Sequence, residues 1–106
     1  MIKHIVVWRL KDFAEGADKF ENAKKIQSLF EMLRSKIKEI RFLDVGINLA
    51  HSEEAADLVL YVEFEDRKGL AIYQNHPEHL KIVEFLRKVR TERRVIDYQT
   101  EEGSKM

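Results

Sequence analysis

The apolar residues of this chain follow two different periods, and the order of those periods limits the folds open to it. Residues 2–10 alternate in steps of two, as in a β-strand, and residues 20–40 recur in steps of three and four, as on one face of a helix. Residues 42–49 and 58–65 return to the two-residue period, and a second helical region precedes a last strand at 93–100. The sequence therefore predicts the order strand, helix, strand, strand, helix, strand.

The only proline of the chain, Pro77, divides the second helical region. Because proline lacks an amide hydrogen, it is tolerated in the first turn of a helix and disrupts a helix interior. We therefore expect one helix to end before Pro77 and another to begin there, capped by Asn75 or His76. Asp18 is the predicted cap of the first helix.

An order of this kind is typical of an α+β, ferredoxin-like βαββαβ sandwich, whose helices cover one face of the sheet. The first and third strands carry apolar residues on both faces, so the uncovered face would be a large exposed patch. A symmetric homodimer, packed sheet against sheet, covers it. We predict one domain at residues 1–100 and a disordered tail at 101–106.

The composition argues against several classes of partner. Lysine plus arginine and aspartate plus glutamate both number 19, so no net charge attracts nucleic acid or an anionic membrane. The chain has no cysteine, which excludes a disulfide framework and suits a reducing compartment. Its apolar runs are far shorter than the roughly 20 residues of a membrane span. We expect a soluble cytoplasmic protein without nucleic-acid or membrane partners.

The segment YQNHPEH, which contains Tyr73, His76 and His79, is the main candidate for chemistry. A neutral His79 can accept a proton at physiological pH, Asp97 can orient it, and Tyr73 can donate a hydrogen bond to a carbonyl oxygen that gains charge. The favoured alternative is structural: His76 caps the helix, and Tyr73 and His79 pack with satisfied hydrogen bonds.

A metal site at His76 and His79 is disfavoured, even with His4 as a third ligand. A catalytic zinc has three protein ligands, and the positive end of the helix that begins at Pro77 repels a dication. Ligation of magnesium by carboxylate or carbonyl oxygens stays open. We predict neither a metal nor a cofactor.

Two inward aromatic residues and one basic run have structural explanations. His4 is expected to be a hydrogen-bonded core residue, and Trp8 to pack in the core or dimer interface rather than close a pocket wall. The run RKVRTERR is expected to be a solvated helix end, with phosphate binding by Arg90, Arg93 and Arg94 as the lesser alternative.

Three segments also carry a likeness to a known family. They are the opening KHIVVWRL with His4, the segment YQNHPEH followed by an apolar helix, and the closing RRVIDYQT with Asp97 and Tyr98. In order, spacing and total length the chain resembles the stress-responsive dimeric α+β barrel family, Dabb. The resemblance implies a homodimer whose two sheets form a barrel, with a pocket between sheet and helices in each protomer.

The resemblance also implies candidate roles for single residues. In a plant polyketide cyclase of the family, a catalytic tyrosine and histidine fall on Tyr73 and His79. The cyclase has a further pocket histidine where this chain has ADLVLYVEF, and a pocket tyrosine on the first helix, where residues 20–30 have none. We therefore expect the fold to carry over and do not predict the cyclase reaction.

These inferences lead to one predicted function and two alternatives. The predicted pocket binds a small apolar or aromatic carbonyl compound and is lined by His4, Tyr73, His79 and Asp97. The first alternative is a cofactor-free lyase, cyclase or oxygenase with His79 as general base. The second is a stress protein whose dimer is itself the product, with no ligand.

Overall fold

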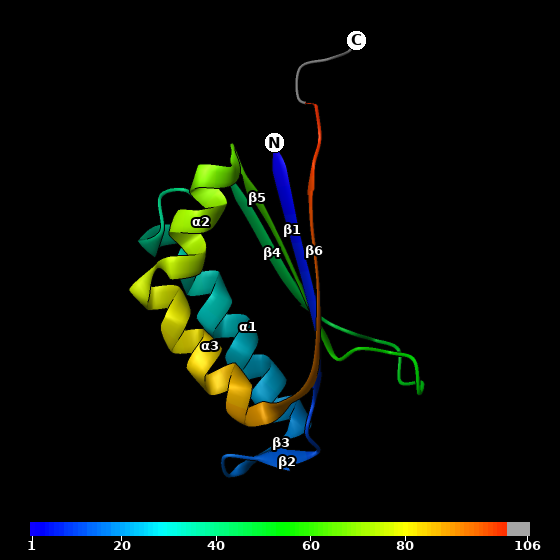
Figure 1. Cartoon of the computed structure of the whole chain (residues 1–106). Helices are drawn as coiled ribbons and strands as arrows, with labels where there is room; N and C mark the ends of the chain where they lie inside the picture. The colour runs from blue at the N-terminus through cyan, green and yellow to red at the C-terminus, as the bar shows by residue number, and fades with distance from the viewer. Residues whose placement is uncertain (102–106) are drawn as a thin grey trace.

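The chain folds into a four-stranded antiparallel sheet with its helices on one face (Figure 1). The structure is a computed structural model that describes residues 1–101, so residues 102–106 of the tail expected at 101–106 lie outside the described residues. In chain order the elements are β1 (Ile2–Leu10), β2 (Phe13–Ala14), β3 (Ala17–Asp18), α1 (Lys19–Lys36), β4 (Phe42–Ile47), β5 (Leu58–Phe64), α2 (Arg67–Asn75), α3 (Pro77–Val89) and β6 (Arg90–Gln99).

The order of strands in the sheet is β4-β5-β1-β6, which confirms the predicted ferredoxin-like arrangement. The second helical region is split between α2 and α3, as Pro77 predicts. The prediction omitted the hairpin of β2 and β3, whose turn residues Glu15 and Gly16 have φ angles of 51° and 77°. Positive φ at both turn positions matches the twist of paired strands. Strands of two residues are too short to show a period in the sequence.

The helices begin at the capping residues that the sequence provides. Asp18 Oδ1 accepts a hydrogen bond from the Glu21 amide at 2.8 Å, and the Glu21 carboxylate accepts one from the Asp18 amide at 3.2 Å. This is a complete capping box at the start of α1. At the start of α3, His76 Nδ1 accepts from the Glu78 amide at 3.1 Å. Asp18 and, of the two candidates beside Pro77, His76 are thus confirmed as caps.

The core lies between the helices and the inner face of the sheet, the face that the helices cover. Burial alternates along β1, whose inward residues face the helices, and on α1 Ile26 and Phe30 are at most 1% exposed. The rings of Trp8 and Phe30 stack with centroids 5.5 Å apart, which joins the sheet to α1. Within residues 1–101, no helix is long and apolar enough to cross a membrane.

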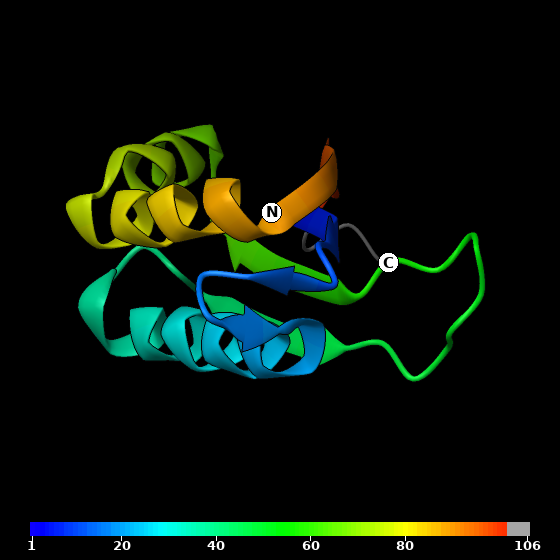
Figure 2. The ribbon, with the colours of Figure 1, turned by 90° about the horizontal axis from the view of Figure 1, so that it is seen from below.

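The outer face of the sheet, opposite the helices, has no covering element among the described residues. Figure 2 shows α1 and α3 side by side on one side of the sheet, with the loop between β4 and β5 projecting on the other. The side chains of this face include several large apolar groups, and Ile96 is 60% and Phe42 50% exposed. Others on this face are Ile5, Val7, Val59, Tyr61 and Tyr98.

The capping box makes a testable contribution to stability. Asp18→Ala leaves amide groups of the first turn of α1 without an acceptor, so we expect the free energy of unfolding in urea to fall by about 1 kcal/mol. Glu31→Ala removes an exposed carboxylate from the same helix and should change it by less than about 0.5 kcal/mol. Equal losses in the two variants would contradict a specific role for the cap.

Candidate functional site

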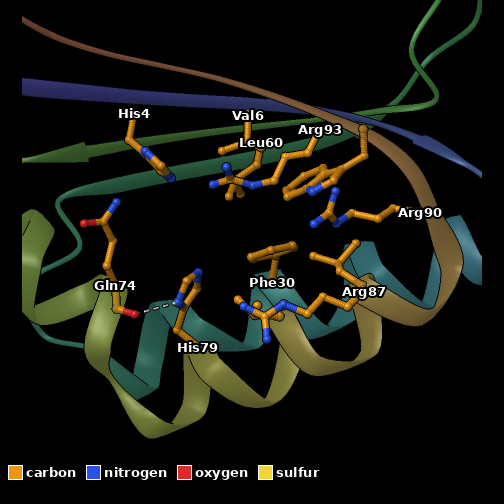
Figure 3. Close-up of a pocket in the computed structure, with 12 residues that line it drawn as sticks. His4, Val6, Phe30, Leu60, Gln74, His79, Arg87, Arg90 and Arg93 are labelled. Atoms are coloured by element: carbon orange, nitrogen blue, oxygen red, sulfur yellow. Dashed lines mark hydrogen bonds between the residues drawn. The ribbon is translucent and has the colours of Figure 1, made fainter.

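A cavity of about 220 Å³, here called the inner cavity, lies between the inner face of the sheet and the helices (Figure 3). Figure 3 shows His4, Gln74 and His79 toward one end and arginine side chains entering from the other. The inner cavity is lined by His4, Val6, Trp8, Phe30, Leu60, Gln74, His79, Val83, Leu86, Arg87, Arg90 and Arg93.

His79 lies in the first turn of α3, and its ring forms part of the wall of the inner cavity. Its Nδ1 lies 3.3 Å from the carbonyl oxygen of Gln74. Because a carbonyl only accepts hydrogen bonds, Nδ1 carries the proton in the neutral ring and Nε2 keeps a free lone pair. Burial lowers the pKa of His79 from 6.5 to about 4, although the bond to the Gln74 carbonyl opposes that shift. At neutral pH the ring is therefore an uncharged acceptor on the cavity wall.

His4 faces the same cavity from β1 and is only 2% exposed. Its Nδ1 is hydrogen-bonded to a carboxylate oxygen of Asp97, because His4 and Asp97 lie directly opposite each other on β1 and β6. The sequence predicts instead that Asp97 orients His79 and lines the pocket. In the structure Asp97 holds His4, and it does not line the inner cavity. The expectation that His4 is a hydrogen-bonded core residue is confirmed, although its ring also reaches the cavity.

Tyr73 lies behind His79 rather than in the cavity wall, contrary to the predicted lining. It is fully buried on α2, and its ring centroid is 4.3 Å from that of His79 and 5.0 Å from that of Phe64. Among the described residues its hydroxyl has no hydrogen-bond partner. Burial raises the pKa of the phenol, so the hydroxyl stays protonated and is a donor without an acceptor.

The remaining sequence candidates take different places. Trp8 is 3% exposed and both packs on Phe30 and lines the inner cavity, so its two predicted roles coincide. His76 does not line the cavity, because its ring is held at the helix cap. Among residues 1–101, no group of three or more histidine, cysteine or carboxylate side chains is arranged to hold a metal ion.

One face of α3 supplies cavity residues that were not singled out in the sequence. Val83, Leu86 and Arg87 follow His79 at spacings of four, seven and eight, which places them on one face of a helix. That periodicity is visible in the sequence. Only the packing of α3 against the sheet shows that this face borders a cavity.

A second hollow, of about 410 Å³, lies at the start of α1 beside the loop between β4 and β5. Its charged side chains already have protein partners: Arg9 lies 3.6 Å from a carboxylate oxygen of Glu92, and Asp18 caps α1. Nζ of Lys19 lies 3.4 Å from a carboxylate oxygen of Asp12 and 3.7 Å from one of Asp57, and Asp57 also accepts from the Leu10 amide at 2.8 Å. We therefore place the candidate site in the inner cavity, where ring nitrogens and guanidinium groups remain open to a ligand.

The lowered pKa of His79 predicts a pH dependence of stability. Between pH 6.5 and 4 the unfolded chain binds a proton at residue 79 that the folded chain does not, so this contribution to stability is complete above pH 6.5 and is lost as the pH falls toward 4. The free energy of unfolding should therefore decline more steeply across this range in the wild type than in His79→Gln. Parallel pH profiles would contradict the assignment, and NMR titration of the His79 ring should give a midpoint near 4.

The unpartnered hydroxyl of Tyr73 predicts an unusual mutational result. Tyr73→Phe removes a buried donor that has no acceptor, so we expect stability to stay the same or rise by up to about 1 kcal/mol. Tyr61→Phe is the matched control, because the Tyr61 hydroxyl donates to Glu63 at 2.5 Å and its removal should lower stability. A loss in Tyr73→Phe equal to that in the control would mean that the Tyr73 hydroxyl is bonded in the folded protein.

Comparison with known proteins places this geometry in a family. The model of the stress responsive A/B barrel domain, Dabb, matches residues 2–100. A search of curated proteins gave no match.

Solved structures share the fold over nearly the whole chain. A dimeric protein of unknown function with a ferredoxin-like fold from Bacteroides fragilis is 30% identical, with a TM-score of 0.82, over 93% of this chain and 95% of that chain. A dimeric ferredoxin-like protein from Thermobifida fusca is 18% identical, with a TM-score of 0.80, over 93% and 90% of the two chains. The hydroxynitrile lyase from Passiflora edulis is 17% identical, with a TM-score of 0.76, over 95% and 94%. With the family model spanning all six elements of the βαββαβ order, the chain belongs to the stress responsive A/B barrel domain family.

Proposed function

We propose that this chain forms a homodimer through the outer face of its sheet and that each protomer binds a small molecule in the inner cavity. The observation that carries the binding role is an open cavity with the uncharged ring of His79 on its wall. The alternative of a dimer with no ligand predicts that side chains fill this space, so the open cavity supports binding over that alternative. The cytoplasmic location expected from the sequence stays a prediction.

The wall of the inner cavity limits the size and character of the ligand. Its volume of about 220 Å³ lies below the roughly 300–1,000 Å³ of pockets for drug-sized ligands, so a single ring with a short substituent is the appropriate size. Trp8 and Phe30 offer aromatic surface, and the Gln74 amide offers a hydrogen-bond donor for a carbonyl oxygen. A small aromatic carbonyl compound matches these groups.

The predicted site residues have distinct roles in this proposal. His79 contacts the ligand through Nε2, which no protein group occupies among the described residues. Tyr73 packs against the His79 ring and holds its orientation. The bond from Asp97 to His4 fixes the second imidazole on the opposite wall.

The only tryptophan in the chain reports on binding, because Trp8 lines the inner cavity. We expect acetophenone to change the fluorescence of Trp8 in a saturable manner. Val83→Phe adds volume inside the cavity and should abolish the response, whereas Leu80→Phe, at an exposed position of the same helix, should preserve it. No saturable response in the wild type would overturn binding of a neutral carbonyl compound, and an equal response in Val83→Phe would overturn binding in this cavity.

The homodimer is supported by the apolar outer face and by the proteins from Bacteroides fragilis and Thermobifida fusca, which are described as dimeric. Ile96→Glu places a charge on this face and should convert the dimer to a monomer in analytical ultracentrifugation. Met32→Glu makes the same kind of change on α1, where Met32 is 50% exposed, and should leave the dimer intact. A monomeric wild type, or a dimeric Ile96→Glu, would contradict the proposed interface.

A second candidate function is proton abstraction from a carbonyl substrate by His79, as in an enzyme of the lyase type. The free Nε2 lone pair favours it, and the fold of the Passiflora edulis hydroxynitrile lyase is the same. A base is most effective when its pKa lies near the working pH, and a value about three units below neutrality makes His79 a weak one. Because the pKa of His79 lies so far below neutral pH, we rank binding above catalysis.

Deuterium exchange separates the two functions. A base in the cavity should accelerate exchange of the methyl protons of acetophenone in heavy water, measured by NMR, and His79→Gln should abolish the acceleration. Binding alone predicts a fluorescence response without any acceleration of exchange. Acceleration that persists in His79→Gln would exclude His79 as the base.

A further inference from the structure

We infer that the ligand of the inner cavity is a small aromatic monocarboxylate, whose carboxylate pairs with Arg87, Arg90 and Arg93 and whose ring packs on Trp8 and Phe30. This inference rests on the proposed binding function and narrows its ligand to an anion. It follows from where the three arginines lie, from the absence of protein partners for them among the described residues, and from the apolar wall beside them.

A β-bulge brings two of these arginines to the same side of the sheet. Residues three apart in a regular strand point to opposite faces. In β6, however, Arg93 pairs with Trp8 and Arg90 pairs with Leu10, while Glu92 pairs with Arg9 and the register shifts between Arg9 and Leu10. Because the bulge adds one residue to β6, both Arg90 and Arg93 share the inner face with Trp8 and Leu10.

The third arginine comes from the helix that precedes β6. Arg87 lies eight residues after His79, two turns along the same face of α3. Figure 3 shows Arg90 and Arg93 reaching toward the cavity from the side of β6, and Arg87, which also lines it, extending along α3. Two separate elements thus deliver three guanidinium groups to a space of about 220 Å³.

The guanidinium groups of Arg87, Arg90 and Arg93 have no anionic partner among the described residues, in contrast to those of Arg9, Arg41 and Arg94. Arg41 lies 2.8 Å from a carboxylate oxygen of Glu65, and Arg9 and Arg94 lie 3.6 Å and 3.5 Å from carboxylate oxygens of Glu92. Within residues 1–101, the side chains of Arg87, Arg90 and Arg93 make no ion pair and donate no hydrogen bond to a protein group, and the one side-chain hydrogen bond to Arg93 is accepted by its backbone carbonyl from Arg94. The acidic and basic residues of the chain balance, so the positive charge gathered at this cavity is a local feature and not a consequence of net charge.

The cavity wall does not neutralise the three charges. Among its lining residues there is no aspartate or glutamate, and Asp97, the nearest acid in β6 on the inner face, is bonded to His4. His79 is uncharged at neutral pH, and the charge of Arg93 is one of the lesser causes of its lowered pKa. A carboxylate bound here relieves the repulsion among like charges and accepts the parallel hydrogen bonds that guanidinium groups donate.

The other part of the wall determines what the anion is attached to. Val6, Trp8, Phe30 and Leu60 form an apolar surface beside the arginines, and the stacked rings of Trp8 and Phe30 suit a flat aromatic group. A free inorganic anion leaves this surface without contacts, and a neutral ring leaves the arginines without a partner. A single ring that carries one carboxylate satisfies both.

Benzoate and benzamide test the inference, because they match in shape and differ in charge at neutral pH. Titrations followed by Trp8 fluorescence should show benzoate binding at least tenfold more tightly than benzamide. Arg90→Gln and Arg93→Gln should each weaken benzoate binding about tenfold and leave benzamide binding unchanged, since hydrogen bonds to charged groups are roughly twice as strong as neutral ones. Arg94→Gln changes the neighbouring residue, which lies on the outer face opposite Val7, and should leave both affinities unchanged.

The outcomes separate this inference from the proposed function. Equal affinity for benzoate and benzamide, or benzoate affinity unchanged in Arg90→Gln and Arg93→Gln, overturns the anionic ligand and leaves a binding cavity in place. If Arg94→Gln weakens benzoate binding as much as Arg93→Gln does, the loss of affinity reflects net charge alone. That result also overturns the anionic ligand. No binding of benzoate, benzamide or acetophenone overturns both the anionic ligand and the binding role.

Discussion

The alternation of side chains along β1 is the constraint on which the rest of the structure depends. This strand pairs with β5 on one side and β6 on the other, so every residue from Ile2 to Trp8 is fixed in register by two neighbours. A slip of one residue would exchange its two apolar faces. The same register that buries Val6 and Trp8 on the inner face also turns His4 toward the inner cavity and Ile5 toward the outer face.

The boundary between α2 and α3 positions the second imidazole of the site. Pro77 requires a break in the helix, and the side chain of His76 satisfies the first free amide after it. His79 then falls within the first turn of α3, close enough to the end of α2 for its Nδ1 to bond to the Gln74 carbonyl. One short segment thus contains both a structural cap and a candidate binding group. The cap at His76 sets where α3 begins, and this determines the direction of the His79 side chain.

The electrostatic character of the inner cavity is set by the same packing. Burial keeps His79 uncharged, and the pairing of Asp97 with His4 removes the one acid that β6 directs to the inner face near the cavity. The arginines at the other end then face an apolar wall rather than a counter-ion. A cavity with the uncharged acceptor of His79 at one end and unneutralised cations at the other can orient a ligand that has two different ends.

The sequence by itself determined the order of elements, the caps at Asp18 and His76 and the helical break at Pro77, because each depends on residues within a few positions of one another. It also indicated His79, through its spacing from Pro77. It did not determine that Asp97 bonds to His4 instead of His79, or that Tyr73 lies behind the cavity wall. Those depend on the cross-strand register of β1 and β6 and on how α2 packs. The gathering of Arg90 and Arg93 on one face depends on a bulge that only strand pairing produces, and local periodicity carries no information about pairing between residues 80 or more positions apart.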